Sequence, residues 1–139
     1  DSKLKIQVIG LAVVKTENLV VEKSYQLAIS IVRLYQHLSA TKKEFVLSKQ
    51  LLRSGTSIGA NVEEAVGAQS RADFIAKMSI AYKEARETDY WLRLLRDTDY
   101  LNQTEFENMQ AEAKSVCRII ASILISLKSP QSTDSGSNP

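Results

Sequence analysis

Three helix-start signals divide this chain of 139 residues into four long segments. In each signal a Ser or Thr is followed three residues later by an acid, and the two side chains satisfy backbone N–H groups that lack helical partners. The chain holds only five Gly and two Pro, too few turn residues for a β-sandwich or barrel. We therefore expect an all-α protein. The signals are Thr41 with Glu44, Ser70 with Asp73, and Thr104 with Glu107.

Within these segments, apolar residues recur at steps of three and four, which places them on one face of a helix. The pattern predicts helices at residues 18–39, 42–67, 71–97 and 105–128, joined by short connections that make neighbouring helices antiparallel. The expected fold is an up-down-up-down antiparallel four-helix bundle over residues 18–128. Residues 1–17 form an N-terminal extension, and residues 129–139, rich in Ser, are expected to be a disordered tail. The core stripe is clearest in the third helix: Phe74, Met78, Ala81, Ala85, Thr88, Leu92 and Leu95.

The first helix carries two apolar stripes, although a helix of a monomeric bundle needs only one. One stripe includes Val20, Leu27 and Ile31. The second stripe either lines an interface between subunits or lies in a broad groove between two other helices, and both interpretations stay open. Tyr and Trp on the third helix favour self-association, because these residues are enriched at interface hot spots. The candidate interface residues are Val21, Tyr25, Val32, Tyr35, Tyr90 and Trp91.

The second helix combines an apolar face with a line of polar residues at steps of three and four. Two glycines, Gly55 and Gly59, lie in the middle of this helix. Each costs about 1 kcal/mol relative to Ala there, so the pair indicates a close approach to another helix or a bend. The polar stripe consists of Gln50, Ser54, Ser57, Asn61 and Glu64, with Arg53 one turn before Ser57.

Two kinds of reactive site fit this stripe poorly. A dinuclear metal bundle needs Glu-x-x-His on two of its helices, and the sole histidine, His37, has no Glu three residues before it. Acid catalysis built from Glu64, Glu84 and Glu87 lacks a nucleophile, an oxyanion site and a phosphate loop. We expect no catalytic, cofactor-binding or metal-binding residue and no enzymatic activity.

A structural role suits the stripe better. We expect Ser57 and Asn61 to hydrogen bond across helices, and Arg53 to pair with an acid. A buried polar network of this kind can set helix register and partner choice. The acids considered for Arg53 are Glu64, Glu84 and Glu87.

Charge limits the functions open to a single subunit. Eighteen Lys plus Arg against sixteen Asp plus Glu give a net charge of +2, whereas a domain that binds nucleic acid alone usually shows a far stronger basic footprint. Basic residues gather on the second and third helices, but acidic neighbours dilute them, so a solvated mixed-charge face is an equal alternative. The candidate nucleic-acid contacts are Lys42, Lys43, Lys49, Arg71, Lys77, Lys83 and Arg86, within a larger set that includes Arg53, Arg93 and Arg96.

Cysteine usage and hydropathy point to a compartment. The single cysteine, Cys117, excludes an internal disulfide and fits a reducing environment. No stretch approaches the ~20 apolar residues that a membrane span requires. We expect a cytoplasmic protein with no membrane partner.

The motif Gln-x-x-Arg-x-x-x-Ser-Ile-x-x-Asn-x-x-Glu, which runs from Gln50 to Glu64, resembles the signature of a bacterial family of four-helix-bundle proteins. The family is named from open reading frames in intervening sequences of 23S ribosomal RNA genes, and the resemblance covers roughly residues 19–128. Gly59 stands where members usually carry Pro, and Ala65 where they carry Gly. The resemblance implies a bundle that assembles into a homo-oligomeric ring, five-fold where this has been seen, with no established enzymatic activity.

Residues 83–92 are similar to one branch of that family. A related branch, the accessory proteins of diversity-generating retroelements, is believed to bind nucleic acid and a reverse transcriptase through a basic outer surface. The resemblance therefore implies three partners: other copies of the chain in a pentamer, RNA or DNA, and a reverse transcriptase if the chain belongs to the retroelement branch.

Taken together, these features predict a non-enzymatic homo-oligomeric binding module for RNA or an RNA–protein partner. Five copies of a +2 subunit would present about +10 on one ring, so assembly would offset the weak charge of each copy. The alternative is a protein-only scaffold that docks a partner protein through the first helix and Trp91.

Overall fold

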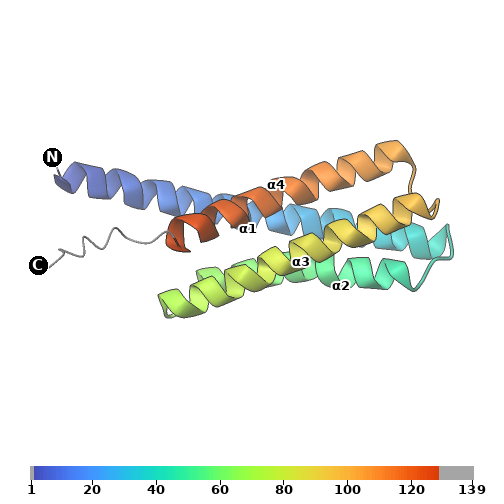
Figure 1. Cartoon of the computed structure of the whole chain (residues 1–139), viewed down its shortest axis with the longest axis horizontal. Helices are drawn as coiled ribbons and strands as arrows, with labels where there is room; N and C mark the ends of the chain where they lie inside the picture. Colours follow the sequence, from blue (N-terminus) through green and yellow to red (C-terminus); the bar gives the residue numbers. More distant parts are fainter. Residues whose placement is uncertain (1, 129–139) are drawn as a thin grey trace, which may run out of the picture.

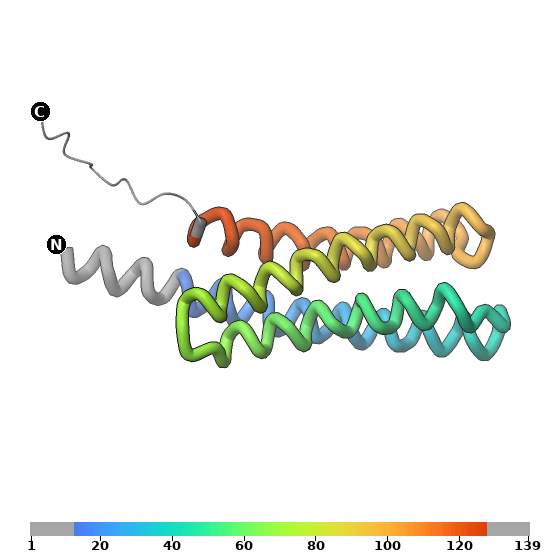
Figure 2. The backbone as a smooth tube through the Cα atoms, turned by 60° about the horizontal axis from the view of Figure 1, so that its bottom comes forward, coloured from blue at the N-terminus to red at the C-terminus, as the bar shows by residue number. Residues whose placement is uncertain are grey.

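The computed structural model describes the backbone of residues 2–128 and the side chains of residues 13–127. The described chain forms four α-helices and no strand. Each helix runs antiparallel to the next (Figures 1 and 2), and α1 also contacts α4, which closes the bundle. The predicted all-α, up-down-up-down four-helix bundle is confirmed. The helices are α1 (Ser2–Ala40), α2 (Leu47–Val66), α3 (Arg71–Asp97) and α4 (Gln103–Lys128).

Helix α3 begins and ends at the predicted residues. The Ser70 hydroxyl accepts a hydrogen bond from the Asp73 N–H at 3.1 Å, which satisfies one of the N–H groups left free in the first turn. The local cap therefore determines this boundary.

The predicted start of the second helix is wrong, because Thr41 does not cap it. The Thr41 N–H donates to the His37 carbonyl at 2.9 Å and so belongs to the end of α1. The carboxylate of Glu44 caps α2 instead, accepting from the N–H groups of Leu47 at 2.8 Å and Ser48 at 2.7 Å. Burial alone would raise the pKa of Glu44, but these backbone hydrogen bonds outweigh it and hold the pKa below its ordinary value.

The second helix starts later than predicted, at Leu47, whereas the fourth starts earlier, at Gln103. The capping pair of the fourth helix is Asn102 with Glu105 and not Thr104 with Glu107. The Asn102 N–H donates to the Glu105 carboxylate at 3.1 Å. The Glu105 N–H donates to the Asn102 side-chain oxygen at 2.8 Å. This reciprocal pair is a capping box with Asn in place of Ser or Thr.

The first helix is longer than the periodicity predicted. It begins at Ser2 instead of residue 18, so α1 runs through most of the expected N-terminal extension. The expected disordered tail, residues 129–139, lies outside the described residues.

The core follows the predicted stripes closely. On α3, all members of the stripe from Met78 to Leu95 are buried, and Phe74 packs partly exposed against them. On α1, Val20, Leu27 and Ile31 are fully buried. The hydrophobic effect therefore places these helices as the sequence pattern indicates.

Helices α1 and α2 approach closely at the two mid-helix glycines. A Cβ atom at Gly55 would lie 2.8 Å from the Ile31 side chain, and one at Gly59 would lie 3.3 Å from the backbone oxygen of Ser24. Both contacts are shorter than ordinary van der Waals distances, so a larger residue would push the helices apart. The glycines serve a close helix approach, one of the two predicted roles.

Candidate functional site

The residues of the polar stripe of α2 lie in different environments: in the core, in contact with α3, or at the surface. Ser54 is fully buried, and its hydroxyl is hydrogen-bonded to the Thr88 hydroxyl of α3 at 3.1 Å. Thr88 also donates to the backbone oxygen of Glu84 at 2.8 Å. This small buried network joins α2 to α3 with its polar atoms paired, as buried polar groups require. Gln50 at the other extreme is exposed.

Next to the Ser54–Thr88 bond, Arg53 pairs with two acids of α3, Glu84 and Glu87. We call these three residues the Arg53 cluster. The guanidinium lies 3.3 Å from the Glu84 carboxylate and also bonds the Glu87 carboxylate. This confirms two of the three acids predicted for Arg53. The charge of Glu84, only 7% exposed, is balanced from the neighbouring helix.

The pKa values of the two acids of the Arg53 cluster are shifted in opposite directions. Burial, with the nearby Glu87 carboxylate, raises the pKa of Glu84 despite the opposing charge of Arg53. Burial would also raise the pKa of Glu87, but hydrogen bonds from Glu84 and Arg53 outweigh it and lower the pKa. The cluster therefore holds Glu87 ionised more firmly than Glu84.

The rest of the stripe departs from the prediction. The Asn61 amide donates to the Ser57 carbonyl at 2.9 Å and to its hydroxyl at 3.0 Å, all within α2, so the expected bond across helices is wrong. Glu64 pairs with Lys77 of α3 at 3.2 Å and not with Arg53. Residues four apart on one helix face each other, which explains the local Ser57–Asn61 contact.

The predicted interface residues lie partly or fully on the surface. Tyr25 is 59% exposed and Tyr90 is 50% exposed, while Val21 and Trp91 pack against the core from its edge. The Trp91 ring meets Tyr90 edge-on, with 5.0 Å between centroids. Its indole N–H is buried without a hydrogen bond, although the ring lies near enough to Glu87 to help lower the pKa of that acid. Val32 and Tyr35 are half-buried on α1.

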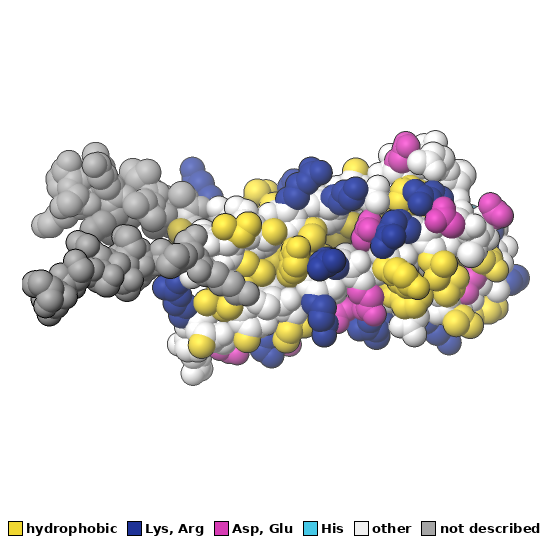
Figure 3. Space-filling view, viewed as in Figure 1, with side chains coloured by type: hydrophobic (Ala, Val, Ile, Leu, Met, Phe, Trp, Pro, Cys, Tyr) yellow, Lys and Arg dark blue, Asp and Glu magenta, His cyan; other side chains and the backbone are white. Residues whose placement is uncertain are grey.

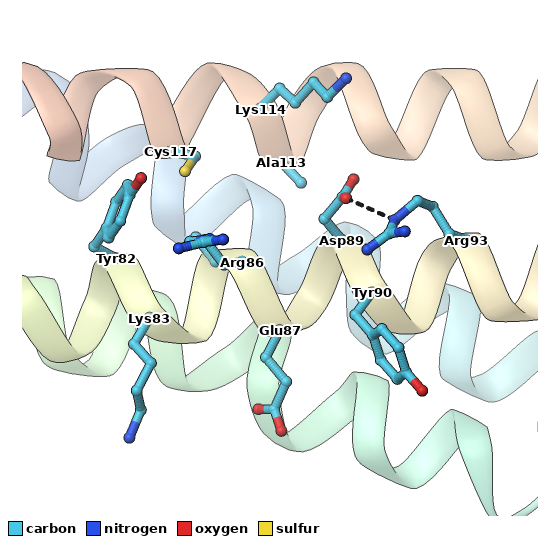
Figure 4. Close-up of a pocket in the computed structure, with 11 residues that line it drawn as sticks. Tyr82, Lys83, Arg86, Glu87, Asp89, Tyr90, Arg93, Ala113, Lys114 and Cys117 are labelled. Carbon is cyan, nitrogen blue, oxygen red and sulfur yellow. Dashed lines mark hydrogen bonds and ion pairs between the residues drawn. The ribbon is translucent and has the colours of Figure 1, made fainter.

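A groove of about 650 Å³ lies between α3 and α4. Its floor holds small side chains, Ala85, Ala113 and Cys117, which leave the space between the helices unfilled. Figure 4 shows the rest of the lining as two lines of side chains on α3 and Lys114 on α4. One line points toward α4 and the other away from it. The first line is Tyr82, Arg86, Asp89 and Arg93, and the second is Lys83, Glu87 and Tyr90.

The acids of this α3–α4 groove are neutralised within the protein. Asp89 accepts from Arg93 at 3.0 Å and from the Gln110 amide at 2.9 Å, while Glu87 turns to Arg53. Four cations and two acids line the groove, which leaves 4 − 2 = +2. Three of the cations form no ion pair within the described part of the chain: Lys83, Arg86 and Lys114.

The structure therefore divides the predicted nucleic-acid contacts. Lys83 and Arg86 lie in the groove, but Lys77 is paired with Glu64 and Arg71 donates to the backbone oxygen of Leu127. The other predicted nucleic-acid contacts lie in or just after the connection between α1 and α2: Lys42, Lys43 and Lys49. Figure 3 shows Lys and Arg along the visible face, interrupted by acidic and apolar side chains.

Sequence reasoning missed Lys114, because it considered basic residues of the second and third helices only. Lys114 directly follows Ala113, a buried position of the α4 stripe, so the helical period could have placed it beside the groove. Cys117 sits deeper, and burial raises the pKa of its thiol despite the nearby Arg86 and Arg118. A protonated thiol suits packing better than nucleophilic chemistry.

A second hollow, of about 670 Å³, lies at the end of the bundle where α1, the α2–α3 turn and α4 meet. Its lining is mostly apolar and includes Val13, Phe74 and Ile123. No group of His, Cys, Asp or Glu side chains suited to a metal ion occurs among the described residues. None of the described helices combines the length and the apolar character that crossing a membrane requires.

Comparisons with known proteins agree on one relationship. The profile described as 23S rRNA-intervening sequence protein matches residues 16–122. Among solved structures, the chain is similar to a protein with unknown function from the S23 ribosomal protein family of Bacteroides thetaiotaomicron VPI-5482. The two chains are 50% identical, with a TM-score of 0.78 over 78% of this chain and 97% of that chain. No curated protein sequence matches.

Proposed function

Because the chain belongs to the 23S rRNA-intervening sequence protein family, we propose that it is a non-enzymatic RNA-binding protein whose contact surface is the α3–α4 groove. The observation that carries the proposal is the set of three unpaired cations in that groove, on two different helices. Cations without an internal partner are free to bind phosphate at no cost of breaking an ion pair.

The arrangement overcomes the objection that acids dilute the basic residues. Glu84 and Glu87 are drawn to Arg53 on the α2 side of α3, and Asp89 is held by Arg93 and Gln110. The groove keeps a net charge of +2, equal to the net charge of the whole chain. The groove therefore stays positive although acids alternate with bases along the sequence of α3.

We further propose that the protein acts as a homo-oligomer, a pentameric ring, so that several grooves contact one RNA. A single groove of +2 offers few phosphate contacts, and repeating it on a ring multiplies the affinity. The second stripe of α1 supports this assembly, because Tyr25 is 59% exposed on a helix whose other stripe is buried. Light scattering measures the mass directly, and a monomer at working concentration would remove the ring.

The test of RNA binding is fluorescence anisotropy with fragments of 23S ribosomal RNA across a salt series. We expect the triple variant Lys83→Gln, Arg86→Gln, Lys114→Gln to bind at least about tenfold more weakly, and the dependence of log affinity on log salt to flatten by about 2 to 3. The matched control, Lys42→Gln, Lys43→Gln, Lys49→Gln, removes the same charge outside the groove. Equal losses in both variants, or no binding by the wild-type oligomer at low salt, would refute the proposal.

A protein-only scaffold is the second candidate function. It is favoured by the half-exposed Tyr90 and the Trp91 ring that it meets edge-on, since Trp and Tyr often anchor protein interfaces. This function predicts a defined protein and no nucleic acid in material purified from native cells. A reverse transcriptase among those proteins would support membership of the retroelement branch.

A further inference from the structure

We infer that the α3–α4 groove takes single-stranded RNA in preference to a duplex, with an unpaired base stacked on Tyr90 and the adjoining phosphates on Lys83, Arg86 and Lys114. The inference rests on the proposed function and adds the form of RNA and the way a base is held.

The first argument is where the central cation lies. Arg86 belongs to the line of side chains that points toward α4, between Tyr82 and Asp89 (Figure 4). The Arg86 side chain is exposed, so a phosphate meets its guanidinium at the mouth of the groove. A single strand can turn a phosphate toward this cation while an unpaired base reaches Tyr90. In a duplex the bases are paired and stacked on each other, so no base is available to a protein side chain.

The second argument is the depth of the groove. The buried Ala85 and Ala113 form its floor, and their methyl groups leave room for a flat ring to approach the bundle. A space of about 650 Å³ is of the size that holds small flat ligands, and an unpaired base is a group of this kind.

The third argument is the pair of tyrosines among the cations. Tyr82 and Tyr90 are eight residues apart on α3, which is about 12 Å along a helix, and both line the groove. Tyr90 is 50% exposed. Unpaired bases stack on exposed aromatic rings, whereas bases inside a duplex are stacked on each other and unavailable.

The surroundings of Tyr90 suit a base with its phosphate. The Arg93 guanidinium lies 5.9 Å from the centre of the Tyr90 ring, so a cation and an aromatic surface stand together. Lys83 lies on the same line of α3 as Tyr90, two turns earlier. Neither tyrosine hydroxyl is hydrogen-bonded within the described residues, so both remain available to phosphate or sugar oxygens.

The experiment compares three labelled probes by anisotropy with the full-length oligomer: a twelve-nucleotide RNA without self-structure, the same RNA annealed to its complement, and the single-stranded DNA of the same sequence. We expect the single-stranded RNA to bind at least about tenfold more tightly than the duplex. Tyr90→Leu should weaken single-strand binding about five- to tenfold, as the loss of one stacked base does, whereas Tyr90→Phe should retain it. Phe45→Leu is the matched control and should have no effect, because it removes a ring of similar exposure, 49%, that lies outside the groove.

The results distinguish a failure of this inference from a failure of the proposed function. Duplex binding equal to or tighter than single-strand binding would overturn the preference for single strands while leaving RNA binding in place. Failure to bind any probe at low salt would overturn both. Tighter binding of the DNA strand would overturn the assignment to RNA. Equal losses in Tyr90→Leu and Tyr90→Phe would overturn stacking, provided that circular dichroism shows both variants folded.

Discussion

The two sides of helix α3 carry charged residues of the same kinds but use them differently. Toward α2, every acid of the Arg53 cluster meets a cation, and the buried Ser54–Thr88 bond lies beside it. Toward α4, Arg86 lies in an open groove without a partner acid, and Lys83, also unpaired, lines that groove from the side of α3 that points away from α4. The first side holds two helices together, and the second leaves charge available to a ligand.

The cause of this difference lies in the helical period. Glu84, Glu87 and Thr88 fall on the face of α3 that α2 covers, while Tyr82, Arg86 and Asp89 fall on the face beside α4. A run that alternates acids and bases in sequence is therefore sorted into two faces in space. Charge averaged along the sequence hides this separation.

The largest expected effect is the loss of stability when the ion pairs on the α2 side of α3 are removed. Arg53→Met leaves Glu84 and Glu87 without their cation, and because Arg53 is 52% exposed we expect a loss of about 1–2 kcal/mol, between the values for exposed and buried pairs. Urea denaturation measures the loss. RNA affinity should fall by no more than about two- to fivefold, because Glu87 loses its cation at the edge of the groove. Adding Glu84→Gln should recover part of the stability. An unchanged urea midpoint, or a large loss of RNA binding, would contradict the distinct roles of the two sides.

A smaller stability effect is expected from the buried hydroxyl pair. Thr88→Val removes the hydrogen bond to Ser54 and should cost about 1 kcal/mol. Thr56→Val is the matched control, because the Thr56 hydroxyl bonds only to carbonyls of its own helix, at 2.7 Å from that of Leu52. If thermal unfolding shows equal losses for both variants, the bond between helices contributes nothing specific.

On the groove side, one substitution should increase binding. Asp89→Asn removes the acid that competes with RNA phosphate for Arg93 and keeps an oxygen that can accept from Gln110. We expect RNA affinity to rise about two- to fivefold, in line with the 0.5–1 kcal/mol of an exposed ion pair. Glu112→Gln removes the same charge where Glu112 accepts from Ser30, away from the groove. An equal rise in both would assign the effect to net charge alone.

The smallest effect concerns acid pH and the Arg53 cluster. The raised pKa of Glu84 means that the folded state binds a proton more readily, so acidification from neutral pH toward the ordinary value of 4.5 adds stability. The lowered pKa of Glu87 has the opposite sign, because its stabilisation is present above 4.5 and is lost as the pH falls through the lower folded pKa. Glu84→Gln should therefore remove the gain and keep the loss.

Urea midpoints of wild type and Glu84→Gln between pH 7 and about pH 4 measure this difference. We expect it to be a few tenths of a kcal/mol, because the charge of Arg53 opposes the effect of burial on the pKa of Glu84. Parallel curves for the two proteins would show that the opposing pKa shifts have no effect on folding. RNA binding above pH 6 should not differ between the two proteins, since Glu84 is not among the residues that line the groove.

Most of the bundle could be predicted from local signals. The Ser70 cap and the apolar stripe from Met78 to Leu95 place α3 correctly, because caps and periodicity act over a few residues. Two helix starts could not be predicted, because Glu44 and Asn102 took the capping roles given to Thr41 and Thr104. Several polar residues stood near each start, and only the path of the turn selects among them.

The candidate site was less accessible to prediction. The sequence analysis left three acids open for Arg53, and the structure shows Glu84 and Glu87 as its partners. Ser57 and Asn61 bond within one helix, and Glu64 pairs with Lys77. Lys114 belongs to another helix entirely, and nothing along α3 points to it. Which side chains meet across helices depends on the rotation and offset of each helix, quantities that no local pattern contains.

By itself, therefore, the sequence determined four helices, their order and most of the core, because periodicity, caps and short connections are local properties. It also carried the family motif from Gln50 to Glu64. Only the tertiary structure decided which acids are neutralised and which cations remain free, since Arg53 reaches Glu84 and Glu87 only when α2 lies beside α3. The position of that helix follows in part from the close approach to α1 at Gly55 and Gly59. The net charge of +2 is a property of the chain, whereas the groove that brings Lys83, Arg86 and Lys114 together is a product of helix packing.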